Sequence, residues 1–111
     1  MPPAFGIVHV TLESVIISCD DVYASFLGRP REEAIGRRIA EFIGEDVGAG
    51  GGPETMISIL VRTGEPISIR RTFVRPDGTK LPCCFQLCLV RDAEGRPQSV
   101  VGIGQVALDS C

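Results

Sequence analysis

Five segments of the chain carry alternating or continuous apolar residues over the length of a strand, a pattern typical of β-structure. They are residues 6–12, 15–19, 67–74, 81–90 and 99–108. Glu13-Ser14 separates the first two segments, while Asp77-Gly78 and a longer turn at residues 92–95 separate the last three. Glycine accepts the positive φ of such turns without steric cost. The chain is therefore predicted to begin with a hairpin and to end with an antiparallel meander.

Between the second and third segments the apolar residues recur at helical spacing, in several short pieces. Asp20 or Asp21 can cap a helix over residues 22–27, because a carboxylate oxygen accepts the free amide hydrogens of a first turn. A glycine follows this helix and ends it. Two further short helical pieces are predicted over residues 30–36 and 39–43.

The longest helix is predicted for residues 53–63, which a proline opens and Gly64 ends. Its apolar face consists of Met56, Ile57, Leu60 and Val61. The helix is expected to pack on the core through this face. The preceding glycine tract, residues 48–53, lacks the Lys and Ser/Thr that follow in a phosphate-binding loop, so we expect a flexible flap over the interior.

The composition indicates one small domain. With 111 residues, 44% of them hydrophobic, the chain can build a single core, and the domain is expected to span residues 1–111 with its core at about 6–108. The net charge of −3 and the scattered basic residues argue against nucleic acid or an anionic membrane as a partner. No apolar run reaches the roughly 20 residues of a membrane span, and the first residues lack a signal-peptide pattern. We therefore expect a cytoplasmic protein.

Five short motifs follow one another along the chain in the order found in a known family. Residues 15–28 read VIISCDDVYASFLG, similar to that family's strand, cap, short helix and terminal glycine. Residues 31–37 read REEAIGR, similar to its "eEliGr" helix. The sequences TGE at 63–65, RPDG at 75–78 and DAEG at 92–95 match its glycine before a strand and its two later turns. Over nearly its whole length the chain resembles the PAS sensor domains of signalling proteins.

The resemblance implies an α+β fold, in which a five-stranded antiparallel sheet of order 2-1-5-4-3 has short helices and one longer helix on one face. Such a domain encloses an apolar pocket that can hold a small molecule, and it signals to an effector domain or a partner. The chain departs from the family at Asp20, where Asn is usual and also caps a helix. It departs again at residues 106–108, which read VAL instead of "DIT". This second departure argues against the usual coupling to a C-terminal effector.

Strand alternation assigns the side chains to the two faces of this sheet. If Phe85 faces the helices, its neighbours Cys84 and Gln86 face outward. The pocket is expected to be lined by Phe26, Phe42, Ile59, Leu60, Arg71, Phe73, Cys83, Phe85 and Ile103. The outward set is Cys84, Gln86, Cys88 and Val90. Because this set is rather apolar for a solvent-facing side, we expect it to pack on a second copy, which would form a homodimer.

Neither of the cofactors found in some PAS domains fits this sequence. Haem-binding members use a His on the longer helix, and residues 53–63 contain none. Flavin photoreceptors of the LOV type place a reactive Cys before the glycine tract, where residues 40–46 have none. They also place two Asn on the strands, at positions that match Phe73 and Cys83 here, while Gln105 is one residue out of step with their sensing Gln. We expect a small apolar or acidic molecule instead.

Arg70 and Arg71 are adjacent on one predicted strand, so one of them must point toward the helices. The register set by Phe73 selects Arg71. A buried guanidinium needs an anionic partner, unless its head reaches water at the edge of the sheet. The candidate partners are the carboxylate of a bound acid and the side chains of Glu41, Glu45 and Asp46.

The remaining reactive residues indicate no catalytic and no metal site. His9, the only histidine, is expected on the first strand, either hydrogen-bonded or as a ligand of a metal or haem. The cysteines are Cys19, Cys83, Cys84, Cys88 and Cys111. Their spacing does not suit zinc, and in a reducing cytosol they are expected to be thiols.

Cys84 and Cys88 lie on the same face of one strand but too far apart along it to bridge each other. Across a dimer face, two copies of them could meet and form an oxidation-sensitive switch. Alternatively, both serve as small apolar residues.

Together these observations predict a non-enzymatic sensory or interaction module of a bacterial-type signalling protein. It could be a small-molecule sensor, a ligand-free dimerisation module whose own side chains fill the pocket, or a redox sensor that uses Cys84 and Cys88. A small cone-shaped α+β isomerase or hydrolase would need a buried carboxylate on an inward strand position. None of the last three predicted strands carries one in its interior.

Overall fold

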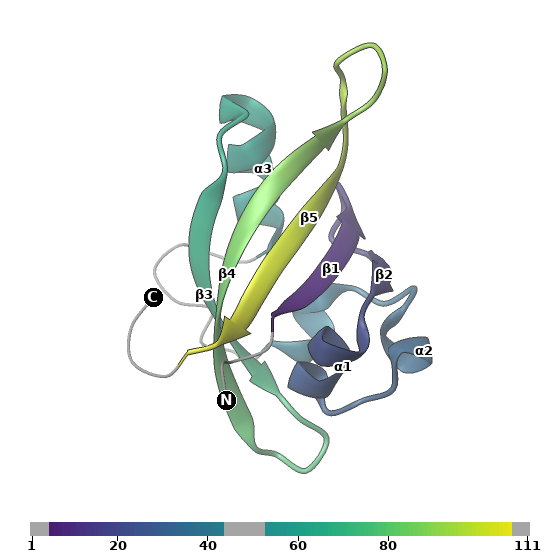
Figure 1. Cartoon of the computed structure of the whole chain (residues 1–111), viewed down its shortest axis with the longest axis vertical. Coiled ribbons are helices and arrows are strands. Elements are labelled where there is room, and N and C mark those ends of the chain that lie inside the picture. Colours follow the sequence, from purple (N-terminus) through teal and green to yellow (C-terminus); the bar gives the residue numbers. More distant parts are fainter. Residues whose placement is uncertain (1–4, 44–52, 108–111) are drawn as a thin grey trace.

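The computed structural model describes residues 5–43 and 53–107 of the chain. The elements are β1 (Gly6–Thr11), β2 (Ile16–Cys19), α1 (Asp21–Leu27), α2 (Arg31–Ala34), the 3₁₀-helix η1 (Ile39–Phe42), α3 (Pro53–Thr63), β3 (Ile67–Val74), β4 (Lys80–Arg91) and β5 (Pro97–Val106). Figure 1 shows α3 behind β3 and β4, and the shorter helices α1 and α2 beside β1 and β2. The predicted sequence of elements is confirmed.

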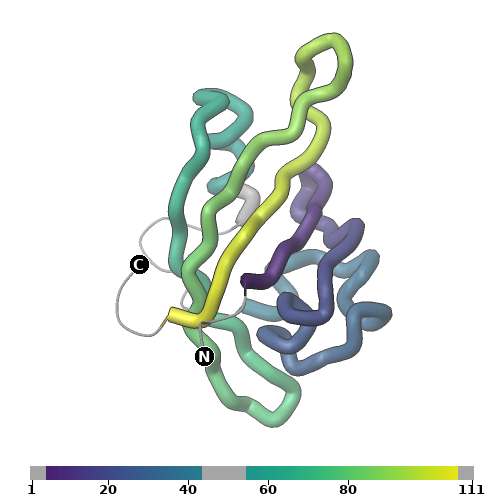
Figure 2. Tube along the Cα trace, viewed as in Figure 1, coloured from purple at the N-terminus to yellow at the C-terminus, as the bar shows by residue number. Residues whose placement is uncertain are grey.

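The five strands form one antiparallel sheet of order β2-β1-β5-β4-β3, which confirms the predicted fold. The helices carry the chain from one edge of the sheet to the other, so the last strand enters between β1 and β4. Figure 2 shows β1 beside β5, although most of the chain separates them in sequence. The centre of the sheet is therefore built from both ends of the chain.

The carboxylate of Asp20 links helix α1 to β1. Asp20 Oδ1 accepts hydrogen bonds from the backbone N–H of Tyr23, at 2.8 Å, and from that of Ile7, at 3.2 Å. The helix ends at Gly28, which has a φ of 69°, a conformation that glycine adopts without steric cost. This cap fixes which side chains of α1 face the sheet.

Four aromatic rings form the centre of the core between α1 and the sheet. They belong to Tyr23, Phe26, Phe73 and Phe85. Their centroids lie between 5.7 and 6.3 Å apart in edge-on arrangements, the geometry that aromatic quadrupoles prefer. Large, shape-complementary rings of this kind hold the helix and the two strands β3 and β4 in one fixed arrangement.

Helix α3 packs on the sheet through Met56, Ile57 and Leu60, which are buried. Val61 was expected on the same face, and this prediction is wrong, because its side chain is exposed. The buried face is narrower than the apolar pattern of the sequence. The glycine tract before α3 lies outside the described residues, except for its last residue, Pro53.

Candidate functional site

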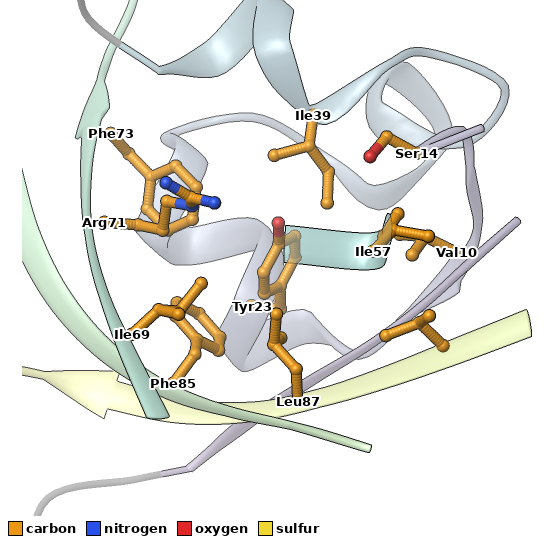
Figure 3. Close-up of a pocket in the computed structure, with 11 residues that line it drawn as sticks. Val10, Ser14, Tyr23, Ile39, Ile57, Ile69, Arg71, Phe73, Phe85 and Leu87 are labelled. Atoms are coloured by element: carbon orange, nitrogen blue, oxygen red, sulfur yellow. The ribbon is translucent and has the colours of Figure 1, made fainter. Parts of the chain in front are cut away.

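A partly open cavity of about 40 Å³ lies between the inward face of the sheet and the helices (Figure 3). The sheet contributes Val10, Ile69, Phe73, Phe85, Leu87 and Val100, and the helices contribute Ile39 and Ile57. Three polar side chains complete the lining: Ser14, Tyr23 and Arg71. Apolar walls with a few polar groups are the usual composition of a small-molecule site.

Two inward positions of β5, Gly102 and Gly104, present no side chain to the interior, and Val106 is the next inward residue after them. A Cβ atom on Gly104 would meet the ring of Phe85, and one on Gly102 would lie 3.1 Å from Leu87 Cδ2. The side chains of Phe85 and Leu87 on β4 therefore lie over these two positions of β5, and both side chains also line the cavity.

Ser14 reaches the cavity from the turn between β1 and β2. Its φ of 67° is uncommon for a residue other than glycine. Its backbone N–H donates to Thr11 O and its carbonyl accepts from Ile39 N, each at 3.0 Å. The side chain is only 2% exposed, and among the described residues its Oγ has no hydrogen-bond partner. Buried hydroxyl groups without a hydrogen-bond partner are rare in folded proteins. A bound molecule could supply the missing partner of Ser14.

Tyr23 lines the cavity from α1 and carries a hydroxyl. Its ring makes edge-on contacts with the rings of Phe26, Phe73 and Phe85. Burial raises the pKa of this hydroxyl far above its ordinary value. The group is therefore protonated at neutral pH and can donate a hydrogen bond to a ligand.

Arg71 reaches the cavity from β3 and is 6% exposed, whereas Arg70 is exposed. The predicted inward orientation of Arg71 is confirmed. Burial lowers the pKa of its guanidinium and the nearby Tyr23 opposes this effect, yet a guanidinium stays protonated in proteins. Arg71 also has an interaction within the protein.

Of the three acidic residues predicted as partners of Arg71, the structure describes only Glu41. Glu41 is exposed, where its carboxylate pairs with Arg37 Nη1 at 3.6 Å and accepts from Arg38 N at 3.1 Å. Glu45 and Asp46 lie outside the described residues. Of the described acidic side chains, none lines the cavity.

Of the predicted pocket residues, Arg71, Phe73 and Phe85 line the cavity. Four others are buried in the surrounding core without lining it: Phe26, Phe42, Leu60 and Cys83. Ile59 is half-buried on α3, outside the lining.

The expectation for Ile103 is wrong. It lies on the outward side of β5, pairs with Ile7 of β1 and Gln86 of β4, and is 43% exposed. The alternation of β5 places Val100 and the two glycines inward instead. Because two of those inward positions are glycines, Ile103 is the larger apolar residue of this stretch, and the sequence pattern therefore assigned it to the core.

Sequence reasoning did not single out Ser14, Tyr23 or Ile39 for the site. Tyr23 precedes Phe26 by three residues on α1, and this spacing puts both on one helix face, so it could have been found. Ser14 has no comparable signal, because its position depends on a left-handed turn conformation that Ser seldom adopts.

The outward face of the sheet carries an apolar patch that we define as Ile7, Cys88, Val101 and Ile103. These residues are neighbours across β1, β5 and β4, since Ile7 pairs with Ile103 and Val101 pairs with Cys88. Ile7 and Ile103 are exposed, and the other two are half-buried. Gln86 lies beside the patch, and the predicted outward positions of Cys84 and Val90 fit the same alternation.

His9 also lies on this outward face, where its Nε2 and Ser99 Oγ share a hydrogen bond of 2.6 Å. This bond supports a hydrogen-bonded role rather than ligation. In residues 5–43 and 53–107, no three His, Cys, Asp or Glu side chains cluster as a metal site requires.

The cysteines of the described segments differ in their state. Cys19, Cys83 and Cys88 are free thiols, whereas Cys84 is disulfide-bonded. The expectation of thiols throughout is therefore wrong at Cys84. Burial raises the pKa of Cys83 to about 11, and burial, with Asp20 nearby, also raises the pKa of Cys19. Both thiols are protonated and poorly reactive at neutral pH.

The positions that match flavin-binding residues are placed as follows. Phe73 and Cys83 are inward and buried, while Gln105 pairs with Cys84 on the outward side of the sheet.

No helix in the described parts of the chain has the length and apolar character needed to cross a membrane.

Comparison with known proteins gives one family. The model of the PAS fold matches residues 4–107. No curated protein matches the chain.

Three solved structures illustrate the likeness. The PAS domain of an HTR-like protein from Haloarcula marismortui has a TM-score of 0.76 at 19% identity, covering 93% of this chain and 86% of that one. The PAS-B domain of Drosophila melanogaster Cycle W398A, with bound glycerol, has a TM-score of 0.78 at 12% identity, covering 92% and 99%. The light-state LOV domain of the blue-light photoreceptor Aureochrome1 has a TM-score of 0.77 at 18% identity, covering 94% and 82%. At these identities the likeness establishes the fold alone.

Proposed function

The chain belongs to the PAS-fold family, and we propose that it is a sensory module in which a small molecule in the interior cavity alters the outward face of the sheet. The observation that carries this proposal is the cavity itself, an apolar space that three polar side chains reach from separate elements. The signal would leave through the partner that the outward face contacts.

The size and the polar groups of the cavity favour a pocket that holds a guest molecule over a pocket that the protein's own side chains fill. A water molecule needs about 10–15 Å³ of such space, and the cavity offers about 40 Å³. The buried Ser14 Oγ, without a partner among the described residues, costs about 1–3 kcal/mol unless a guest molecule bonds to it. Both features support binding of a molecule that combines apolar and polar atoms.

Strand β4 offers a short route from the cavity to the outward face. Phe85 and Leu87 line the cavity, and the residues between and after them, Gln86 and Cys88, face outward. A ligand that pushes the inward side chains moves the same backbone that carries the outward ones.

We propose that the occupant of the outward patch is a second copy of the chain. The patch extends over β1, β5 and β4, from Ile7 to Cys88. It contains no charged side chain. Interface centres are depleted of charge, and an uncharged face meets its own copy without repulsion. The resulting interface would be isologous, with the same patch on both protomers.

We also propose that the module has no catalytic activity of its own. The inward positions of the sheet carry no carboxylate in the described strands, and His9 faces outward. A general acid or base for a bound substrate is therefore lacking on the sheet side of the cavity.

A native mass spectrum of the purified domain, compared with its denatured spectrum, tests both parts of the proposal. We expect a dimer that carries extra mass, which denaturation removes. Ile57→Phe, which fills the cavity, should remove the extra mass, whereas the matched variant Val61→Phe on the exposed side of α3 should keep it. A monomer contradicts the dimer, and extra mass that persists in Ile57→Phe contradicts the cavity as its site.

A further inference from the structure

We propose that the cavity binds a short-chain carboxylic acid that carries a second oxygen, as a hydroxyl or carbonyl, at the end away from its carboxylate. This inference rests on the proposed function and names the chemical class of its ligand. It follows from the polar groups of Arg71, Tyr23 and Ser14, which reach one small apolar cavity from opposite sides (Figure 3).

Arg71 and Tyr23 form the end that holds the carboxylate. In Figure 3 the guanidinium and the phenol oxygen both point toward the middle of the pocket. A guanidinium presents five N–H donors, so it can serve a protein partner and a ligand at once, and its planar fork matches a carboxylate. The protonated Tyr23 hydroxyl adds a neutral donor beside this charge. An amide or an alcohol would use these donors less well than an anion does.

Ser14 forms the opposite end. Its hydroxyl is buried, has no partner among the described residues, and points into the pocket from the side away from Arg71 (Figure 3). A hydroxyl both donates and accepts, so it bonds equally to a ligand hydroxyl or a carbonyl oxygen. An acid with a purely apolar tail would leave it unpaired at a cost in free energy. The ligand therefore has oxygen at both ends.

The walls between these ends limit the carbon chain. Val10, Ile39 and Ile57 line the cavity between and beside these polar groups, and they favour carbon there (Figure 3). A cavity of about 150 Å³ encloses benzene. The enclosed space here is about 40 Å³, less than a molecule of benzene's size requires, so a guest of two or three carbons fits only by extending into the open side of the cavity.

Three probe molecules with the same three-carbon chain separate the contributions: 3-hydroxypropionate, propionate, which lacks the second oxygen, and 3-hydroxypropanamide, which lacks the charge. Each is titrated into the whole 111-residue protein at constant ionic strength, and binding is followed by NMR shifts of the cavity residues. In the wild-type protein, we expect 3-hydroxypropionate to bind about tenfold or more tightly than either of the others.

The variants assign each preference to a residue. Arg71→Met should abolish the preference for the acid over the amide, and Arg70→Met, the neighbour that faces solvent, should preserve it. Ser14→Ala should abolish the preference for the hydroxy acid over propionate. Tyr23→Phe should weaken the binding of both acids by a similar factor.

Equal affinities for acid and amide in the wild-type protein would overturn the inference, and this comparison does not depend on the folding of any variant. An acid preference that survives Arg71→Met would overturn it too. If the amide binds in the cavity as well as the acid does, the ligand class is wrong but the proposed function stands. The proposed function fails separately, when the native spectrum shows no ligand and no probe shifts the cavity residues.

Discussion

Gly104 shows how one missing side chain shapes the interior. It faces inward on β5, and the ring of Phe85 lies where its Cβ would be. That Cβ would also lie 2.5 Å from the backbone oxygen of Cys84, a contact that no rotamer change relieves. The residue is therefore part of the packing of β4 on β5.

Gly104→Ala is expected to destabilise the domain by about 1–3 kcal/mol through overpacking, measured by urea unfolding. Gly102→Ala is the matched control, because its Cβ would meet the ends of the Leu87 and Val8 side chains, at 3.1 and 3.2 Å, and these can move. Its loss of stability should be smaller. Equal losses at the two positions would contradict this account of the packing.

Asp20 is the second residue on which local structure depends, since its carboxylate joins α1 to β1. Asp20→Ala removes both hydrogen bonds and should lower the free energy of unfolding by about 1–2 kcal/mol. Asp20→Asn keeps a capping oxygen and should lose much less. The comparison uses urea denaturation followed by circular dichroism, and an Asn variant as unstable as the Ala variant would refute the capping role.

At the scale of the element, β4 is the strand that connects the interior with the surface. Cys83 is fully buried on its inward side, and Cys88 is half-buried on its outward side. Burial raises the pKa of Cys83 to about 11, which leaves little of the reactive thiolate near neutral pH. The two thiols therefore report on the two faces of one strand.

In the monomeric variant Ile103→Glu, where no second copy covers the outward patch, iodoacetamide is expected to alkylate Cys88 well before Cys83 and Cys19, by at least about tenfold in rate. Peptide mapping by mass spectrometry after timed quenching measures each site. In urea the three rates should converge, because burial no longer separates them. Alkylation of Cys83 as fast as that of Cys88 in the folded domain would contradict the assignment of faces.

The elements themselves were predictable because each has a local cause. Asp20 before an apolar turn, the glycine at position 78 between two apolar runs, and the alternation around Phe85 each need only neighbouring residues. The cavity was less predictable, because it depends on how separate elements meet. Ser14 lines the cavity because its turn has a positive φ. Ile103 faces away from the cavity, because Val100, Gly102 and Gly104 take the neighbouring inward positions of β5.

At the scale of the whole molecule, the two faces of the sheet divide the proposed function between ligand and partner. Ile103→Glu places a charge in the centre of the outward patch and should convert the dimer to a folded monomer, because a buried unpaired charge is costly. Ile35→Glu is the matched control: Ile35 is exposed to a similar degree, 46% against 43%, and lies after α2, outside the sheet.

Analytical ultracentrifugation at several concentrations measures the outcome for both variants, with circular dichroism to verify folding. The account predicts a monomer for Ile103→Glu and a dimer for Ile35→Glu. A dimer that survives Ile103→Glu would place the interface elsewhere on the surface.

The central claim, that the inward face of the sheet keeps a space for a small molecule, can be tested without knowledge of the ligand. Xenon enters apolar cavities, so methyl NMR spectra recorded under xenon pressure locate such a space directly. The account predicts shifts concentrated on the methyl groups of Val10, Ile57, Leu87 and Val100, and their loss in Ile57→Phe. Shifts confined to the outward patch, or none at all, would contradict it.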